Sequence, residues 1–252
     1  MKKKITILLC ILVSLCQAQT LKVSYLEKIN LADSPKIDVS QIQGAEMSPG
    51  LEAMVQKMIE EQNKKNSEGK EYELYSVNGE SIYQKTEVKE VENEAITTIT
   101  LNEKDIFYRN FKDKQITNQT SILSKTFLIN EDEKSFDWQI SDQTEMIGTY
   151  KCKKATSLSE EGLVAWFTNE VPISTGPRQY YGLPGLIVKL TLGTLTIEAI
   201  DVKIMDEIVA IEKPTKGKNV SRKKYNEIRD EKLNLNDNNN NNEGIRVKMI
   251  EI

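Results

Sequence analysis

The chain has 252 residues, of which 38% are hydrophobic and 29% charged, and its formal net charge is −4. Three of its 34 basic residues and none of its 38 acidic residues lie in the first 18 positions, so the remainder carries about −7. This balance argues against a nucleic-acid or anionic-lipid partner, because such surfaces need clustered positive charge.

The chain contains no histidine. Ser-His-Asp and Cys-His catalysis are therefore excluded, and the usual imidazole ligands of zinc and copper are missing, so we predict no cofactor and no metal site. Paired carboxylates such as Glu160-Glu161 could in principle hydrolyse glycosides. They fall in predicted turns, where a solvated charge cluster is the usual explanation. A His-independent hydrolase is kept as a remote alternative to a non-enzymatic protein.

Residues 1–18 have the pattern of a secretory signal. Lys2 to Lys4 give a basic start, Ile5 to Leu15 an apolar stretch, and Ala18 a small residue before the expected cut. The apolar stretch is too short to span a bilayer, which needs about 20 residues, and no later stretch is long and apolar enough to do so. Leu precedes both Cys10 and Cys16, which argues against lipidation. We expect an exported protein of the periplasm or the outer-membrane periphery.

Only Cys152 lies beyond this leader, so no intramolecular disulfide can form in the exported chain. Cys152 alternates with Tyr150 in a β-type pattern. Free cysteine is among the most buried residue types, and we predict a buried structural thiol.

A helix is predicted after Ser48-Pro49. Five apolar residues then follow at helical spacing and form one stripe, which we expect to cover a sheet face. Closure of the core is the favoured explanation of the stripe, and the alternative is that its two methionines line an adaptable apolar cavity. The stripe consists of Leu51, Met54, Val55, Met58 and Ile59. A second, shorter helix is expected from Ser221, with Val220 packing on Tyr225.

Most other segments alternate as strands do. Leu21-Val23-Tyr25, Phe136-Trp138-Ile140 and Met146-Gly148-Tyr150-Cys152 are examples. Asn78-Gly79 and Gly193-Thr194 predict tight hairpins. The order of strands and turns favours an antiparallel meander. We expect one β-rich domain over residues 19–252, with an Asn-rich loop at 237–243.

Residues 181–187 have the distinctive sequence Tyr-Gly-Leu-Pro-Gly-Leu-Ile. Pro184-Gly185 fits a type II turn, with Pro at its second position and Gly at its third. The residues that follow are apolar and predict a buried strand. Turn geometry does not itself require Leu183, so this side chain is a candidate for an exposed apolar contact.

The hexapeptide from Gly182 to Ile187 resembles the hallmark of the GLPGLI family, exported proteins of Bacteroidetes-type bacteria without an established activity. The similarity extends to further motifs along the chain. These are Tyr150, Cys152, Ala155, Ala165-Trp166-Phe167-Thr168, Val171-Pro172-Ile173, Gly176-Pro177 and Lys213 to Lys218. We take it to cover nearly all of residues 19–252.

These observations predict a mainly β fold, a curved antiparallel sheet or half-barrel with one or two covering helices. That arrangement is similar to periplasmic carriers of lipidated proteins, a likeness of architecture alone. The leading hypothesis is a non-enzymatic envelope protein that binds a hydrophobic ligand or acyl chain. The alternative is a protein-interaction module of an outer-membrane assembly or uptake system. The candidate ligand-binding residues are Leu51, Met54, Val55, Met58, Trp166 and Leu183, with Gly182, Leu183, Pro184, Gly185, Leu186 and Ile187 as the structural motif.

Overall fold

The computed structural model describes residues 19–30, 49–85 and 105–232, and within them twelve strands and two helices. The first six strands are β1 (Thr20–Ile29), β2 (Lys70–Val77), β3 (Glu80–Lys85), β4 (Ile106–Asn110), β5 (Gln115–Ile122) and β6 (Lys125–Asp132). The others are β7 (Trp138–Ile147), β8 (Tyr150–Ser157), β9 (Val164–Thr168), β10 (Leu186–Leu192), β11 (Leu195–Met205) and β12 (Lys218–Val220). The helices are α1 (Pro49–Glu68) and α2 (Arg222–Lys232).

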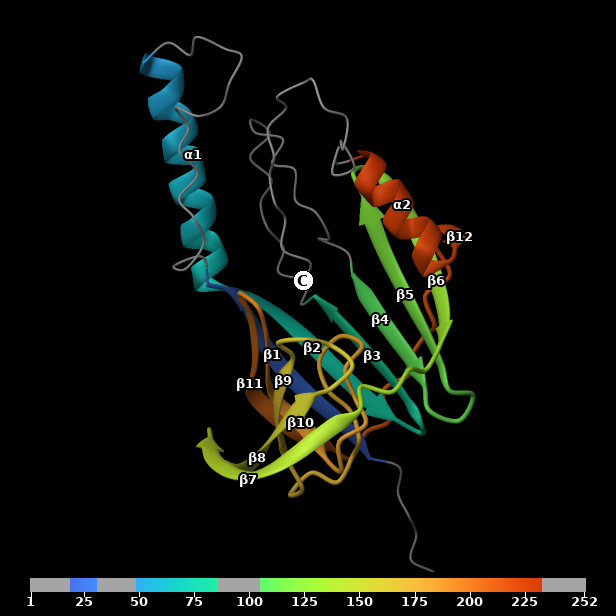
Figure 1. Ribbon diagram of the computed structural model, residues 1–252. Coiled ribbons are helices and arrows are strands. Elements are labelled where there is room, and N and C mark those ends of the chain that lie inside the picture. The colour runs from blue at the N-terminus through green and yellow to red at the C-terminus, as the bar shows by residue number, and fades with distance from the viewer. Residues whose placement is uncertain (1–18, 31–48, 86–104, 233–252) are drawn as a thin grey trace, which may run out of the picture.

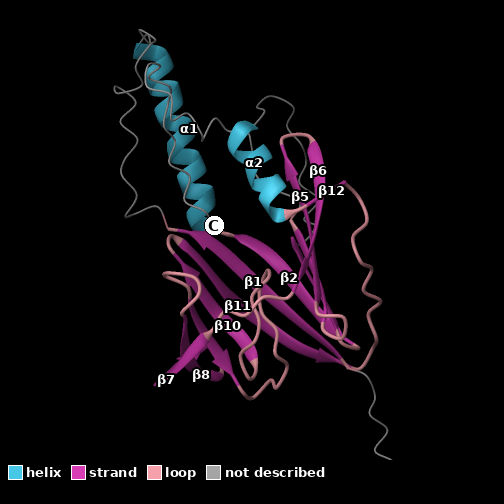
Figure 2. Cartoon of the chain, turned by 45° about the vertical axis from the view of Figure 1, so that its right-hand side comes forward, coloured by secondary structure: helices cyan, strands magenta, loops and turns pink. Residues whose placement is uncertain are grey.

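All twelve strands belong to one sheet, in the order β12-β6-β5-β4-β3-β2-β1-β11-β10-β9-β8-β7. Every neighbouring pair is antiparallel except β12 and β6, which are parallel. The sheet is strongly curved and does not close, since β12 and β7 remain as its two edges (Figures 1 and 2). The predicted mainly β, curved sheet is confirmed.

Turn residues set the hairpins. Asn78 and Gly79 both have positive φ, 54° and 82°, as a type I′ turn requires. Gly193, at φ 55°, begins the predicted hairpin between β10 and β11. One prediction was wrong: the run from Met146 to Cys152 is not a single strand. The chain reverses at Gly148 (φ 56°), so Ile147 faces Tyr150 across a hairpin.

One face of the sheet carries the core. On β1 the residues Leu21, Val23 and Tyr25 are almost fully buried, and the intervening residues are partly exposed. The register places Tyr72 and Leu74 of β2 beside them on this face. Because strand side chains alternate between the two faces, Glu27 falls on the same buried side of β1. It is a charged residue in an otherwise apolar row.

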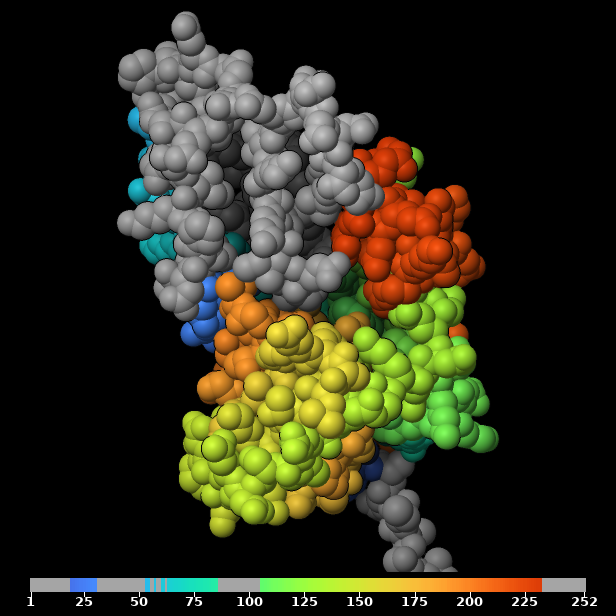
Figure 3. All heavy atoms as spheres, in the orientation of Figure 1, coloured from blue at the N-terminus to red at the C-terminus, as the bar shows by residue number. Residues whose placement is uncertain are grey.

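A loop between β9 and β10, residues 169–185, fills the hollow of the sheet. In Figure 3 the yellow atoms of this part of the chain lie between yellow-green β7 and green β4 to β6. The amide of Gly185 donates to the Leu183 carbonyl at 2.8 Å, which forms a γ-turn around Pro184. The amide of Leu186 donates instead to Val171 at 3.0 Å. The predicted type II turn is therefore replaced by a tighter turn that ties the loop to itself.

Gly185 is required by a close approach. A Cβ atom at this position would lie 2.0 Å from the carbonyl oxygen of Thr168. No side chain fits there without separating the start of β10 from the end of β9. Pro184 thus restricts the backbone of the turn, and Gly185 permits the close contact with the backbone of Thr168.

The two helices are placed differently. α1 rises from the end of the sheet and extends beyond it (Figures 1 and 2), so the expectation that it lies across a sheet face was wrong. α2 lies on the core face at the other side, where Tyr225 packs against Phe127 and Ile129. Ser221 Oγ accepts the amide of Lys224 at 3.2 Å and so caps the helix, which agrees with the predicted start at Ser221.

The leader at 1–18 and the Asn-rich stretch at 237–243 lie outside the described residues. Within the described ranges, no helix is long and apolar enough to cross a membrane.

Candidate functional site

A charged pair is buried on the core face where the loop meets β1. Arg178 donates from Nε to Oε1 of Glu27 at 2.9 Å and from Nη2 to Oε2 at 2.7 Å. The hydroxyl of Tyr83 donates to Oε1 at 2.6 Å. Burial raises the pKa of Tyr83 well above its ordinary value, so this hydroxyl keeps its proton. Three hydrogen bonds therefore hold the Glu27 carboxylate in one orientation.

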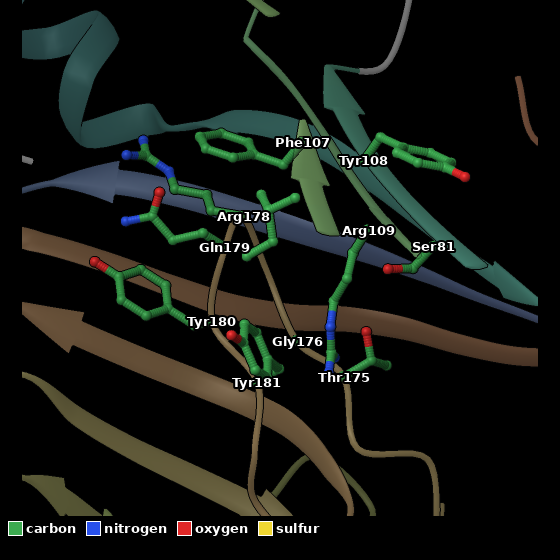
Figure 4. A pocket seen from close by; sticks show the side chains of 11 residues that line it. Ser81, Phe107, Tyr108, Arg109, Thr175, Gly176, Arg178, Gln179, Tyr180 and Tyr181 are labelled. Carbon is green, nitrogen blue, oxygen red and sulfur yellow. The ribbon is translucent and has the colours of Figure 1, made fainter. Parts of the chain in front are cut away.

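The loop backbone aims Arg178 at this carboxylate. Arg178 itself has φ 53°, in the left-handed region that few residues other than glycine adopt. Two positions earlier, Gly176 approaches so closely that an added Cβ would lie 2.8 Å from Ile187 Cβ. In Figure 4 the Arg178 side chain extends from the loop toward β1, with Phe107 nearby. A residue held in an unfavourable conformation at such a contact indicates a functional or architectural constraint.

Asp105 is the second acid of this region. It directly precedes β4, on the same face as Phe107 two positions on. Its Oδ1 atom is buried and has no hydrogen-bond partner among the described residues. Burial raises the pKa of Asp105 to about 6, although a hydrogen bond with Thr120 and the charge of Arg178 oppose the rise. An unsatisfied buried oxygen is costly and needs an explanation.

These groups surround one cavity of about 120 Å³. Its polar wall contains Glu27, Arg178 and Asp105, and its aromatic wall contains Tyr72 and Phe107. The ring of Tyr72 stacks on that of Tyr83, with centroids 5.2 Å apart. Ile29, Leu195, Asn66 and Lys70 complete the lining. For scale, an engineered apolar cavity of about 150 Å³ binds benzene. The volume therefore suits a single ring or a short chain.

A second hollow beside it has a volume of only about 10 Å³ (Figure 4). Arg109 is one of the residues that line it. It pairs with Glu133, donates to the Ser174 carbonyl at 2.9 Å, and its guanidinium carbon lies 3.6 Å from the ring centroid of Tyr181. At this volume the hollow admits about one water molecule. We interpret Arg109 as an anchor that fixes the loop to β4.

The residues predicted as a ligand site are not brought together. Met54, on α1, is 58% exposed. Trp166, on β9, is partly buried, and its register partners on the neighbouring strands are Lys154 and Lys189. None of Met54, Trp166 and Leu183 lines either cavity described above. The side chains of Leu51, Val55 and Met58 lie outside the described part of the structure.

Leu183 is the clearest correction. We expected an exposed apolar contact, but its side chain is 1% exposed and belongs to the hydrophobic core. The tight turn at Pro184 directs it into the hollow of the sheet, beside the equally buried Leu186 and Ile187. The motif is therefore a packing unit, and Leu183 is one of its core residues.

Three residues of the cavity had not been singled out from the sequence. Glu27 continues the alternating row Leu21-Val23-Tyr25, and a charge at a buried strand position was the available signal. Arg178 directly follows Gly176-Pro177 and lies within residues 158–189, the segment that matches a family model. Asp105 carried no signal of its own, since its burial depends on how distant strands come together.

A charged group in a cavity also raises the question of a metal. No group of three or more His, Cys, Asp or Glu residues within residues 19–30, 49–85 and 105–232 could hold a metal ion. The carboxylate oxygens of Glu27 already accept hydrogen bonds from Arg178 and Tyr83.

Residues 158–189 match a family model described as a protein of unknown function (Porph_ging), a segment that includes Arg178 and the turn at Pro184. No curated protein matches the chain.

Two solved structures of PNGF-II are similar to this chain. The structure in space group P21 has a TM-score of 0.51 and 15% sequence identity, over 84% of this chain and 33% of that one. The structure in space group C2 has a TM-score of 0.49 and 14% identity, over 84% of this chain and 32% of the other. The chain thus spans about a third of the length of PNGF-II, and the likeness is one of fold.

Proposed function

We propose that this protein is an exported, non-enzymatic member of the GLPGLI family that binds the apolar part of a ligand on the core face of its curved sheet. The observation that carries the proposal is the cavity of about 120 Å³, which combines an apolar wall with a buried ion pair. Ligand sites are typically concave, mostly apolar and provided with a few fixed polar groups.

The size of the cavity narrows the expected ligand. Ile29, Leu195 and the ring of Phe107 supply apolar surface, and each buried methylene contributes about 0.8 kcal/mol. The cavity is smaller than the benzene-binding cavity of about 150 Å³, so a long acyl chain does not fit inside it. We therefore propose that a short alkyl segment or one ring enters, and that any longer chain continues outside.

The test is native mass spectrometry of the protein purified from the cell envelope, alone and as the variant Ile29→Phe. Ile29 lines the cavity, so a larger ring there should displace a copurified ligand. Ile208→Phe is the matched control, because Ile208 is 61% exposed and lies outside the cavity. A ligand mass lost only in Ile29→Phe supports the proposal. No adduct in the wild-type protein, or an equal adduct in all three, would contradict it.

A partner protein is the second candidate, supported by the open edge of the sheet at β7. Among the described strands it pairs only with β8, and its Ile140 and Met146 are 46% and 62% exposed. Exposed edges can accept a strand from another chain. In the same experiment, a protein mass instead of a small-ligand mass would favour an interaction module of an outer-membrane system.

A further inference from the structure

Asp105 is the least satisfied polar group of the cavity. The Glu27 carboxylate accepts three hydrogen bonds, whereas Oδ1 of Asp105 accepts none from the described part of the chain and is nevertheless buried. No ion pair joins Asp105 to another described residue. A buried carboxylate without a counterion is costly. This oxygen is therefore an acceptor to which a bound molecule could supply the donor.

The charges around Asp105 come from several elements. Arg178 approaches from the loop and Arg222 from α2, while Glu27 on β1 acts in the opposite direction. Arg178 is already engaged with Glu27 by two hydrogen bonds, and Arg222 with Glu131. Lys70 lies in the cavity wall, and no ion pair joins it to Asp105. The remaining titratable neighbours in the described part of the chain are the tyrosines Tyr72, Tyr83 and Tyr225, which also face this region.

We propose that the cavity binds a primary ammonium group carried on a short apolar stem, with Asp105 Oδ1 as its acceptor. This inference rests on the proposed binding function and specifies its ligand. The chemistry is shared by a small alkylamine and by a lysine side chain of a partner protein, and the experiment below separates these two sources.

The cavity walls suit both parts of such a ligand. An ammonium group beside Asp105 would lie among the rings of Tyr72, Tyr83 and Phe107, and aromatic faces attract cations. The stem would contact Ile29 and Leu195. A butyl chain is comparable in size to a single ring, so it matches the volume. A neutral alcohol of the same length would fill the same space without supplying charge.

Binding should depend on pH in one direction. An ammonium ligand favours the ionised carboxylate, and its own pKa near that of lysine, about 10.4, keeps it protonated below pH 9. Because the pKa of Asp105 is about 6, affinity should be full above pH 7 and fall as the carboxyl group becomes protonated. A neutral alcohol should show no such loss.

The experiment is an NMR titration of the protein over residues 19–252 with n-butylamine and with n-butanol, at pH 8 and at pH 5. We expect n-butylammonium to bind at least tenfold more tightly than n-butanol at pH 8 and the two to converge at pH 5. Asp105→Asn should remove the preference at pH 8, and Asp142→Asn, at an exposed position of β7, should retain it. The lysine arm uses Nα-acetyl-lysine methylamide, and binding comparable to that of n-butylammonium would assign the site to a protein side chain.

The outcomes separate this inference from the proposed function. Equal binding of amine and alcohol at pH 8 would overturn the ammonium site and leave a general apolar site in place. Absence of binding by both would overturn both proposals. If Asp105→Asn fails to fold, the comparison of n-butylamine with n-butanol in the wild-type protein still tests the proposal.

Discussion

Glu27 and Arg178 are 151 positions apart in the chain and meet through two hydrogen bonds of 2.9 and 2.7 Å. Their side chains are 7% and 19% exposed, respectively. Glu27 shifts the pKa of Arg178 upward against the opposing effect of burial. The pair joins the first strand of the sheet to the loop that carries the family-like motif.

Removal of one partner should leave the other charge buried. We expect Arg178→Met and Glu27→Gln each to lower the free energy of unfolding by about 3 kcal/mol. The double variant should lose clearly less than the sum of the two. Urea unfolding of the four proteins measures this coupling.

The control for this pair is Lys203→Met. Lys203 pairs with Asp201 at 2.5 Å, but the two side chains are 63% and 45% exposed. Exposed pairs contribute about 1 kcal/mol or less. Additive losses in the Glu27 and Arg178 variants would show that the buried pair has no special role in stability.

Gly185→Ala should be strongly destabilising. The added methyl group would lie 2.0 Å from the Thr168 carbonyl oxygen, so β9 and β10 would have to separate locally. Gly162→Ala is the matched control, because Gly162 has φ 77° and no atom within 4 Å of an added Cβ. We expect the control to lose about 1 kcal/mol from backbone strain and Gly185→Ala at least about 2 kcal/mol more. Equal denaturation midpoints would point to a binding role for the motif.

Cys152 should resist thiol reagents in the folded protein. It is fully buried on β8, and burial raises the pKa of its thiol to about 11. Maleimide labelling at pH 7.5 should therefore be about 100-fold slower than in urea, because the thiolate is the reactive form. Leu158→Cys, at a position 71% exposed, provides a rapidly labelled control. Native Cys152 labelling at the unfolded rate would be inconsistent with a structural thiol.

Export is tested by intact mass. The leader pattern predicts that the protein isolated from the cell envelope begins at Gln19. Retention of residues 1–18, or a diacylglyceryl group on Cys16, would refute this.

The sequence predicted local structure well where one residue dictates geometry. Asn78-Gly79 produced the expected hairpin and Ser221 the expected helix start, because turns and helix ends depend on nearby residues. The placement of α1 was mispredicted. An apolar helical stripe indicates that something covers it but does not identify the partner, and here α1 extends beyond the sheet.

The cavity could be predicted only in part. Glu27 breaks an apolar row, so a buried charge on β1 was available from the pattern. Its pairing with Arg178 depends on a left-handed residue in an irregular loop, which strand periodicity does not reveal. Leu183 was misplaced for a related reason, since a γ-turn at Pro184 turns it inward where a type II turn was expected.

The last prediction concerns stability and Asp105. The pKa of this carboxyl group is about 6 in the folded protein and 3.8 without the fold. The folded state therefore holds the proton more tightly. The contribution of Asp105 to stability is greatest below pH 3.8 and is lost as the pH rises through 6.

Asp105→Asn removes this titration and retains the shape of the side chain. The full shift corresponds to about 3 kcal/mol, which partial exposure of the residue reduces to about 2 kcal/mol. We expect the variant to gain little at pH 4 and about 2 kcal/mol at pH 7, in urea unfolding measured from pH 4 to 8. A pH-independent difference would instead reflect a changed hydrogen bond to Thr120. A gain in stability that increases as the pH rises to 6 would show that the ionised Asp105 destabilises the protein without ligand. That result is expected of a carboxylate that accepts a hydrogen bond from a bound cation.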